Sequence, residues 1–476
     1  MTRLARPHRV TPARNPALTR NPALARTLAL ALAGSLALGG CGPQETLPPD
    51  VESPMTETAP AAAPEEEQEV SIEQEYLDEM RALAEHPRIR AAFERIEELE
   101  PWTMENLITI TEIPAPPFME DERAEAFLEM IREIGGVDEA YRDEEGNVIA
   151  VRRGTAGDRV LVVSGHLDTV FPEGTDVTVR FRGDTLYAPG VGDDSRGVAM
   201  LLTLLRAMNE TEIETEQDVW FVGTVGEEGL GDLRGVKHLF REGGPQIDAF
   251  ISIDGGGDAR IVNQALGSRR YRVTFEGPGG HSWGAFGLGN PAHALGRAIR
   301  IFDEAAAGYV AEGPRTSYNV GRIGGGTSVN SIPYEAWMEV DMRSIDPDRL
   351  AGIDRLFVEA MERALGEQNE ERRSGAAMTV DIDQVGDRPS GEIDPATPFV
   401  QRALASVVQM GFEPQLARSS TDSNVPIALG IPAVTIGRGG AGGNAHALDE
   451  WWLNEDGHLA IQRSLLLILA EAGISD

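Results

Sequence analysis

Short, mostly apolar runs recur along the chain, and a glycine, a histidine or an acidic residue follows each of them. Four of these runs cover residues 159–164, 219–225, 249–253 and 433–436. Helical spacing separates them, most clearly at 197–208. Strands without polar alternation are buried on both faces, as in a parallel sheet that helices cover on both sides. The pattern therefore predicts an α/β fold with a mainly parallel sheet.

A different pattern runs from residue 267 to residue 387. It predicts, in order, a strand at 270–275, a helix at 291–306, strands at 316–323 and 335–343, a helix at 347–365 and a strand at 378–384. The order βαββαβ is typical of a small ferredoxin-like α+β domain. Runs typical of the main sheet lie before and after this segment. We therefore expect an inserted domain and a main domain split into 71–266 and 388–476.

The first 40 residues have the composition of an export signal. They hold six arginines and no acidic residue, and residues 27–38 form an uncharged apolar run. This run is too short to span a bilayer but fits a signal peptide. Leu38-Gly39-Gly40-Cys41 resembles a bacterial lipobox, so we expect lipidation of Cys41 and an exported protein anchored in the cell envelope, facing the periplasm or the cell surface. Secretion with an incidental cysteine is the alternative.

The segment 41–70 is rich in proline, alanine and glutamate and shows no apolar periodicity. Such a composition predicts an extended linker whose like charges repel one another. From residue 71 onward the spacing becomes helical, with apolar positions at Tyr76, Met80 and Leu83. We therefore place the start of the folded part at residue 71.

Charge and cysteine content exclude several kinds of protein. The 476 residues carry a formal net charge of −35, which repels polyphosphate and excludes a nucleic-acid binder. We expect membrane contact only through the N-terminal lipid. The single cysteine excludes an internal disulfide and a cysteine-based zinc site. Any metal site must therefore use the eight histidines and the carboxylates.

Clusters of polar residues follow the apolar runs or precede a helix, and such residues gather beyond the carboxyl ends of parallel strands. Each cluster alone has a plain structural explanation, such as a helix cap or a solvated turn. Together, however, the carboxylates would repel one another unless a cation neutralised them. Nitrogen and oxygen ligands suit a pair of divalent ions, zinc first, with manganese or cobalt as alternatives. The clusters are Gly165–Val170, Gly192–Gly197, Gly226–Gly229, Asp254–Gly257 and Gly442–His446.

The motifs GHLDTV, APGVGDDSRG, GEEG, SIDG and GGNAH, in this order, resemble the M20 family of cocatalytic zinc peptidases. That family includes peptidase T, carboxypeptidase G2 and acetylornithine deacetylase. The resemblance covers residues 75–476. It implies a phosphorylase/hydrolase-like catalytic domain, an inserted lid domain through which a homodimer forms, and two zinc ions per chain.

The resemblance also implies a role for each motif residue. His166 and Asp254 bind one metal ion, Glu228 and His446 bind the other, and Asp193 bridges the two. These ligands would hold a water molecule between the ions.

Three further features follow from the same resemblance. Asp168 orients His166 as a supporting carboxylate. Glu227 is not a ligand but the general base that takes a proton from the attacking water. The peptide bond between Asp193 and Asp194 is expected to be cis.

The resemblance gives the lid domain three substrate contacts. His281, in GPGGHSWG, would stabilise the oxyanion, often in the site of the partner subunit. Asn330 and Arg343 would hold a substrate carboxylate, a task that suits the forked guanidinium group. A structural histidine in a loop and an ion pair of Arg343 with Asp341 or Asp346 are the alternatives.

The resulting prediction is hydrolysis of an amide bond near a free terminus of a short peptide, by an exopeptidase of the dipeptidase, tripeptidase or carboxypeptidase type. An N-acyl-amino-acid deacylase with the same metals is the alternative. A lipoprotein that only binds ligand is disfavoured because Glu227 is intact. A two-metal phosphoesterase is disfavoured by the acidic charge and by the lack of a basic phosphate clamp.

Overall fold

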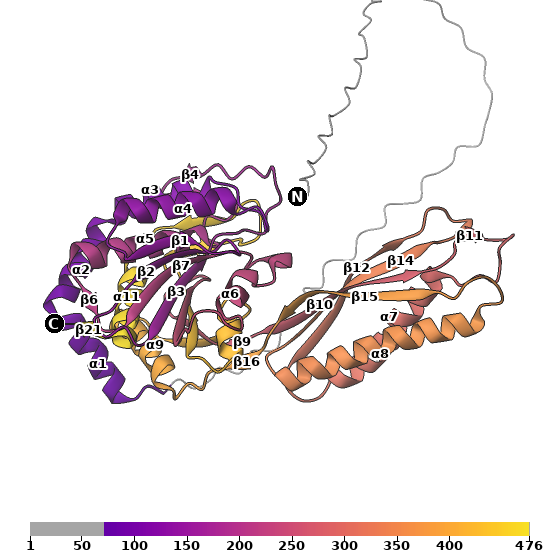
Figure 1. Cartoon of the computed structure of the whole chain (residues 1–476). Coiled ribbons are helices and arrows are strands. Elements are labelled where there is room, and N and C mark those ends of the chain that lie inside the picture. Colours follow the sequence, from indigo (N-terminus) through magenta and orange to yellow (C-terminus); the bar gives the residue numbers. More distant parts are fainter. Residues whose placement is uncertain (1–70, 476) are drawn as a thin grey trace, which may run out of the picture. The chain divides into compact units, whose positions relative to one another are not determined.

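The computed structural model describes residues 71–475 (Figure 1). The predicted signal peptide, the linker and Cys41 lie outside these residues, so export and lipidation stay predictions. Within the described part of the chain, no helix is both long enough and apolar enough to cross a bilayer.

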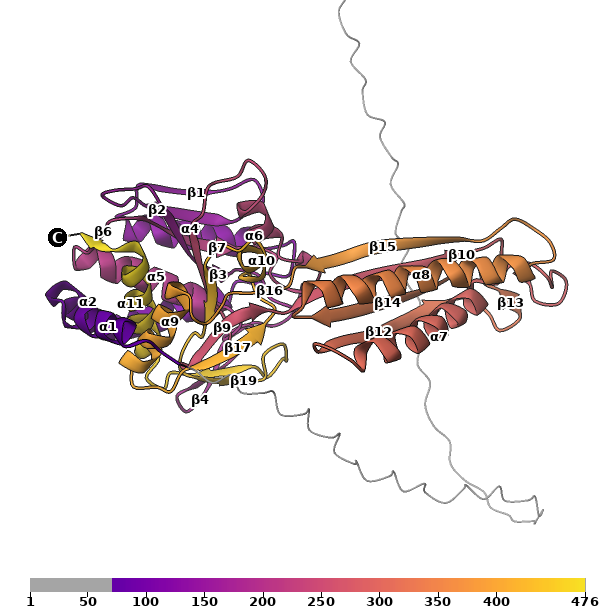
Figure 2. The ribbon, with the colours of Figure 1, turned by 90° about the horizontal axis from the view of Figure 1, so that it is seen from below.

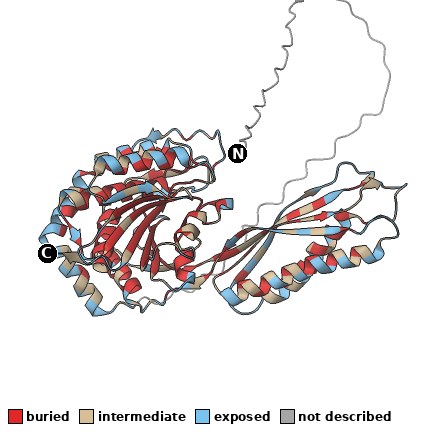
Figure 3. Cartoon of the chain, viewed as in Figure 1, coloured by how far each residue is buried: buried red, intermediate tan, exposed pale blue. Residues whose placement is uncertain are grey.

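The centre of the main domain is a sheet whose inner four strands run parallel. These strands are β7 (Asp218–Thr224), β3 (Val160–His166), β8 (Ala249–Ile253) and β18 (Ala433–Ile436), in this spatial order. Every residue of β8 and β18 is buried, and Figure 3 shows the inner strands almost entirely as buried residues. The prediction of a mainly parallel sheet is confirmed, because these apolar runs are covered on both faces.

Mostly antiparallel pairings flank this parallel centre. β1 and β2 extend the sheet beyond β7. On the other side, β9 pairs antiparallel with β18 and β16 and parallel with β17. Their bounds are β1 Glu139–Arg142, β2 Val148–Arg152, β9 Arg260–Ala265, β16 Gly391–Glu392 and β17 Gln415–Ser419.

Helices cover the main sheet. The helical spacing after residue 71 becomes two helices, because Pro87 lacks an N–H group and begins a new helix after His86. α5 and α11 are buried over most of their length, which explains why both are apolar nearly all round. The bounds are α1 Gln74–Glu85, α2 Pro87–Glu98, α3 Glu100–Thr111, α4 Asp121–Ile134, α5 Ser195–Glu210, η1 Gly229–Gly231, α6 Arg234–Leu239, α9 Pro398–Gln409, α10 Asn424–Ala428 and α11 His458–Ala472.

The inserted segment forms its own antiparallel sheet, in the order β12-β14-β10-β15, with its own core. Figure 2 shows α7 and α8 side by side along this sheet. The rings of Tyr271, Phe302 and Phe357 pack in the core with centroids 5.0–5.1 Å apart. The bounds are β10 Gly267–Glu276, α7 Pro291–Val310, β12 Thr316–Gly325, β14 Glu335–Ser344, α8 Pro347–Glu371 and β15 Thr379–Arg388.

The last lid strand is longer than its apolar pattern predicts. β15 continues past residue 384 to Arg388, because its pairing with β10 resumes after a shift in register at Arg270 and Tyr271. This extension brings Arg388 to the main domain.

Short strand pairs complete the structure. β11 pairs with β13 in the lid segment, β19, β20, β5 and β4 form a small sheet, and β21 pairs with β6. Their bounds are β4 Arg180–Arg182, β5 Thr185–Tyr187, β6 Glu214–Thr215, β11 Gly280–His281, β13 Ser331–Ile332, β19 Ala441–Gly443, β20 Trp451–Leu453 and β21 Ile474–Ser475.

Candidate metal centre

The carboxyl ends of the parallel strands bring the predicted ligands together. His166 is the last residue of β3, and Asp254 directly follows β8. Glu228 lies just after β7, whereas Asp193 precedes α5 and His446 follows β19. This arrangement is the one that strand direction dictates for a parallel sheet.

The carboxylate of Asp193 lies between two histidines. Its Oδ1 is 3.2 Å from Nε2 of His166, and its Oδ2 is 3.2 Å from Nε2 of His446. The same Nε2 of His446 is 2.9 Å from Oε1 of Glu228. One ligand atom each from His166, Asp193 and Glu228 falls within a 4.8 Å group. This donor set, nitrogen from histidine and oxygen from carboxylates, can hold a divalent metal ion. The Asp193–Asp194 peptide is cis, as predicted.

The two ring nitrogens of His166 have different partners, and Nε2 is the one that faces Oδ1 of Asp193, at 3.2 Å. Nδ1 lies 3.0 Å from the backbone carbonyl oxygen of Asp168, which can only accept, so Nδ1 carries the proton. The carboxylate of Asp168 is 3.7 Å from Nδ1 and accepts instead from the backbone N–H groups of Glu227 (2.9 Å) and Glu228 (2.8 Å). Asp168 thus positions the two glutamates as well as the histidine.

Glu227 is buried and paired with an arginine that the sequence analysis did not identify. Nη1 of Arg388 lies 3.1 Å from Oε1 of Glu227, and Nη2 donates to its backbone carbonyl oxygen. Burial raises the pKa of Glu227 well above its usual value, and the charge of Arg388 opposes this shift. Glu227 is therefore paired with Arg388, whereas Glu228 is paired with His446.

Glu450 is a second residue that the sequence analysis missed. It is buried, and its carboxylate accepts from the backbone N–H groups of Gly190 (2.8 Å), Gly192 (2.9 Å) and Asp193 (2.8 Å). Burial, together with the charge of Asp193, raises its pKa to about 7. Glu450 thus fixes the backbone on which Asp193 is placed. The one feature of the sequence that could have pointed to Glu450 is its closeness to His446, four residues earlier.

A cavity of about 400 Å³ opens onto these residues. Its lining includes Asp193, Glu227, Glu228, Asp254 and His446, together with four arginines. Guanidinium groups beside an acidic centre can bind the carboxylate of a substrate. The arginines are Arg260, Arg270, Arg343 and Arg388.

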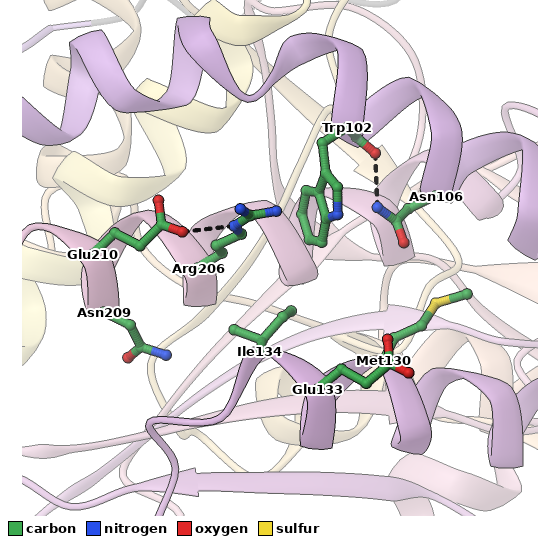
Figure 4. Close-up of a pocket in the computed structure, with 8 residues that line it drawn as sticks. All are labelled: Trp102, Asn106, Met130, Glu133, Ile134, Arg206, Asn209 and Glu210. Carbon is green, nitrogen blue, oxygen red and sulfur yellow. Dashed lines mark hydrogen bonds and ion pairs between the residues drawn. The ribbon is translucent and has the colours of Figure 1, made fainter.

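A second hollow, of about 330 Å³, lies between α3, α4 and α5 (Figure 4). Arg206 lies over the ring of Trp102 at 4.6 Å and donates to Glu210 over 2.8 Å, while Asn106 donates to the carbonyl oxygen of Trp102. The eight residues that line it include no histidine. This hollow therefore lacks the donor set of the candidate centre.

Comparison with known proteins agrees with this geometry. Residues 162–470 match the family model of peptidase family M20/M25/M40. The chain belongs to this family. Carboxypeptidase G2 of Pseudomonas sp. (strain RS-16) is a curated relative, 25% identical over 231 residues, which are 46% of this chain and 53% of that protein. The uncharacterized protein YqjE of Bacillus subtilis (strain 168) is 25% identical over 303 residues, 62% of this chain and 76% of its own length.

A solved structure of a peptidase shares the fold. The aminopeptidase PepT from Bacillus cereus ATCC 10987 aligns with a TM-score of 0.61 and 21% identity, over 77% of this chain and 97% of that chain. At this identity the likeness supports the fold alone. Membership of the M20 family makes this chain a hydrolase.

The lid residues of this M20 chain divide into two groups. Arg343 lines the cavity while its Nε donates to Oδ2 of Asp341 over 2.7 Å, so the ion pair with Asp341 is present. His281 is exposed, and its Nδ1 accepts from the N–H groups of Trp283 and Gly284. Asn330 is exposed and pairs with Ser328. Neither His281 nor Asn330 lines the cavity of its own chain.

Proposed function

We propose that this M20 chain is a dinuclear zinc hydrolase that cleaves the amide bond next to the free carboxyl terminus of a short peptide. The observation that carries the proposal is the placement of Asp193 between His166 and His446, inside a cavity that also holds Glu227 and four arginines. The acidic side of this cavity suits the metal ions, and the arginines suit a carboxylate.

The ligand atoms divide naturally between two ions. One ion would use His166, Asp254 and Oδ1 of Asp193; the other would use Glu228, His446 and Oδ2 of Asp193. Bound zinc supplies Lewis acidity, which makes water a nucleophile near neutral pH and polarises the amide carbonyl.

The chain's own groups carry the protons and orient the substrate. Glu227 takes a proton from the attacking water and passes it to the leaving amine. Arg388 holds Glu227 at the cavity wall through Oε1, which fixes the direction from which the proton is taken. Arg270 and Arg343 share Asp341, at 2.9 and 2.7 Å, so this carboxylate fixes both guanidinium groups at the cavity.

A peptide panel tests the proposal. The zinc-loaded protein is incubated with dipeptides and tripeptides, with the same peptides amidated at the carboxyl terminus, and with N-acetyl and N-succinyl amino acids, and products are followed by mass spectrometry. We expect cleavage of free peptides and strong loss of cleavage after amidation. Equal cleavage of the amidated peptides contradicts carboxylate recognition.

The second candidate function is N-acyl-amino-acid deacylation. It is favoured by the same arginines, because an N-acyl amino acid presents the same free carboxylate beside its amide bond. Hydrolysis of N-acyl amino acids without hydrolysis of any peptide in the panel would replace the first proposal by this one.

We further propose that the enzyme acts in the cell envelope, anchored through Cys41, and that its lid domains pair. The support for anchoring is the basic and apolar pattern of residues 1–41. The support for pairing is the exposure of His281 together with the apolar side chains of the lid residues Trp283, Phe286 and Val329, which are exposed to 89%, 73% and 103%.

A further inference from the structure

A buried arginine contacts both carboxylates that we assign to the first metal ion. Arg438 lies two residues after β18 and is only 7% exposed. Its Nη1 is 3.3 Å from Oδ1 of Asp193 and 3.4 Å from Oδ1 of Asp254. The same nitrogen is 3.8 Å from Oδ1 of Asp194. One positive group thus faces three acidic side chains.

The surrounding backbone fixes this guanidinium group in place. The N–H of Arg438 donates to the carbonyl oxygen of Gly255 over 3.0 Å. On the other side, a Cβ atom at Gly192 would lie 3.2 Å from Nη2 of Arg438 and 3.0 Å from Oε1 of Glu450. The missing side chain of Gly192 therefore makes room for Arg438 beside Asp193, so the guanidinium group is part of the built site.

Among the assigned ligands, Arg438 directly contacts Asp254 and the shared Asp193. Oδ1 of Asp193, which it contacts, also faces His166, whereas Oδ2 faces His446. The ion pairs of Glu228 and His446 in the described chain involve Asp193 and each other, but not Arg438. Arg438 is therefore in direct contact with Asp254, which belongs to the first site alone, and with no ligand that belongs to the second site alone.

This positive charge has opposite effects on the metal-free and the metal-loaded protein. Without metal ions, clustered buried carboxylates repel one another, and a guanidinium group within hydrogen-bond reach offsets that repulsion. With metal ions, the same charge repels any cation that binds the oxygens beside it.

We propose that Arg438 is a built-in counter-cation of the first metal site, defined by His166, Asp193 and Asp254. It stabilises the metal-free fold, and it makes the first site weaker than the second site, defined by Asp193, Glu228 and His446. The two ions then load in order, the second site before the first. This inference rests on the proposed dinuclear centre.

Zinc titration of the metal-free full-length chain tests the inference. Isothermal calorimetry with chelator-buffered zinc should resolve a tight and a weak step in the wild type. In Arg438→Met the weak step should tighten by at least about tenfold, because a repelling charge is gone. The melting temperature of the metal-free variant should fall. An arginine that only supports the fold would lower the melting temperature without tightening zinc binding.

Matched variants separate charge from shape. Arg438→Lys keeps the charge and should keep the weak step weak. Arg402→Met removes the same charge from a distant ion-pair cluster with Glu79 and Glu471, and should leave both steps unchanged. If Arg438→Met does not fold without metal, the rate of zinc loss from the loaded protein to a chromophoric chelator replaces the titration. The first ion to leave should then leave more slowly than in the wild type.

Each outcome separates the inference from the function. If the weak step is unchanged or weaker in Arg438→Met, the proposed role of Arg438 is wrong. Two equal binding steps in the wild type would also show that it is wrong. In both cases the proposed dinuclear centre would stand. A single zinc ion in the fully loaded wild type, measured by elemental analysis, overturns the dinuclear proposal and this inference with it.

Discussion

Arg388 and Glu227 form a buried ion pair, with Nη1 3.1 Å from Oε1, although 161 residues separate them in the chain. Arg388 is the last residue of the lid strand β15, whereas Glu227 follows the main-domain strand β7. The group proposed as general base is thus held by the end of a strand of the inserted sheet. The charge of Arg388 also opposes the rise in the pKa of Glu227 that burial causes.

Removal of this arginine should shift the pH dependence of the reaction. Without Arg388 the pKa of Glu227 rises further, and the base must be deprotonated to act. In Arg388→Met the acidic limb of the kcat/KM profile should therefore move to higher pH, with activity lost first at low pH. Arg388→Lys is the control, because it keeps the charge and should keep the limb near its wild-type position. An unmoved limb in Arg388→Met contradicts the coupling.

Glu227→Gln should lower kcat by on the order of 10²–10⁴, the usual contribution of a general base. Zinc content and KM should stay close to wild type, since Glu227 is not assigned as a ligand. Steady-state kinetics and elemental analysis of the same preparation check both points. Near-normal kcat, or loss of zinc, would show that the role of Glu227 is assigned wrongly.

Asp193→Ala should lose both metal ions and all activity, because its two oxygens face the two histidines. Elemental analysis after gel filtration measures the loss. Asp176→Ala is the control. Asp176 is exposed and forms an ion pair with Arg180, so this variant should retain both ions. Retention of one tightly bound ion by Asp193→Ala would rule out a shared ligand.

His281→Ala should lower kcat by roughly 10²–10³ and leave zinc content unchanged, as expected for one oxyanion donor. His293→Ala, on the exposed side of α7, is the control and should have no effect. Because His281 does not line the cavity of its own chain, mixing His281→Ala with Glu227→Ala should restore some activity. A mixture that stays inactive after confirmed subunit exchange argues against action in the partner site.

Cys41→Ser should abolish fatty-acid labelling and release the protein or block its processing. Metabolic labelling with a lipid analogue, followed by cell fractionation, measures this. Wild-type protein that never takes up label would leave secretion with an incidental cysteine as the explanation.

The meeting of the proposed ligands at one edge of the sheet could be predicted because strand ends leave a local signal. His166 and Asp254 each end an apolar run, and the cis peptide at Asp193–Asp194 followed from the motif. Parallel strand order then requires that such residues meet at one edge of the sheet.

The supporting residues could not be found in this way. Arg388, Arg438 and Glu450 are single charged residues in or beside loops, and no periodicity marks them. Their partners lie far away in the sequence, as with Glu450 and the N–H of Asp193, 257 residues apart. Such pairs become visible only once the fold has brought them together. The length of β15 was also underestimated, because its pairing crosses a shift in register.

The same loop anchors both ends of the lid domain. Arg270, on β10, donates to the carbonyl oxygen of Gly229, and the backbone N–H of Asp387, on β15, donates to the carboxylate of Asp232. This loop directly follows Glu227 and Glu228. A displacement of the ends of β10 and β15 would therefore pull on the loop that follows both the proposed base and one of the proposed metal ligands.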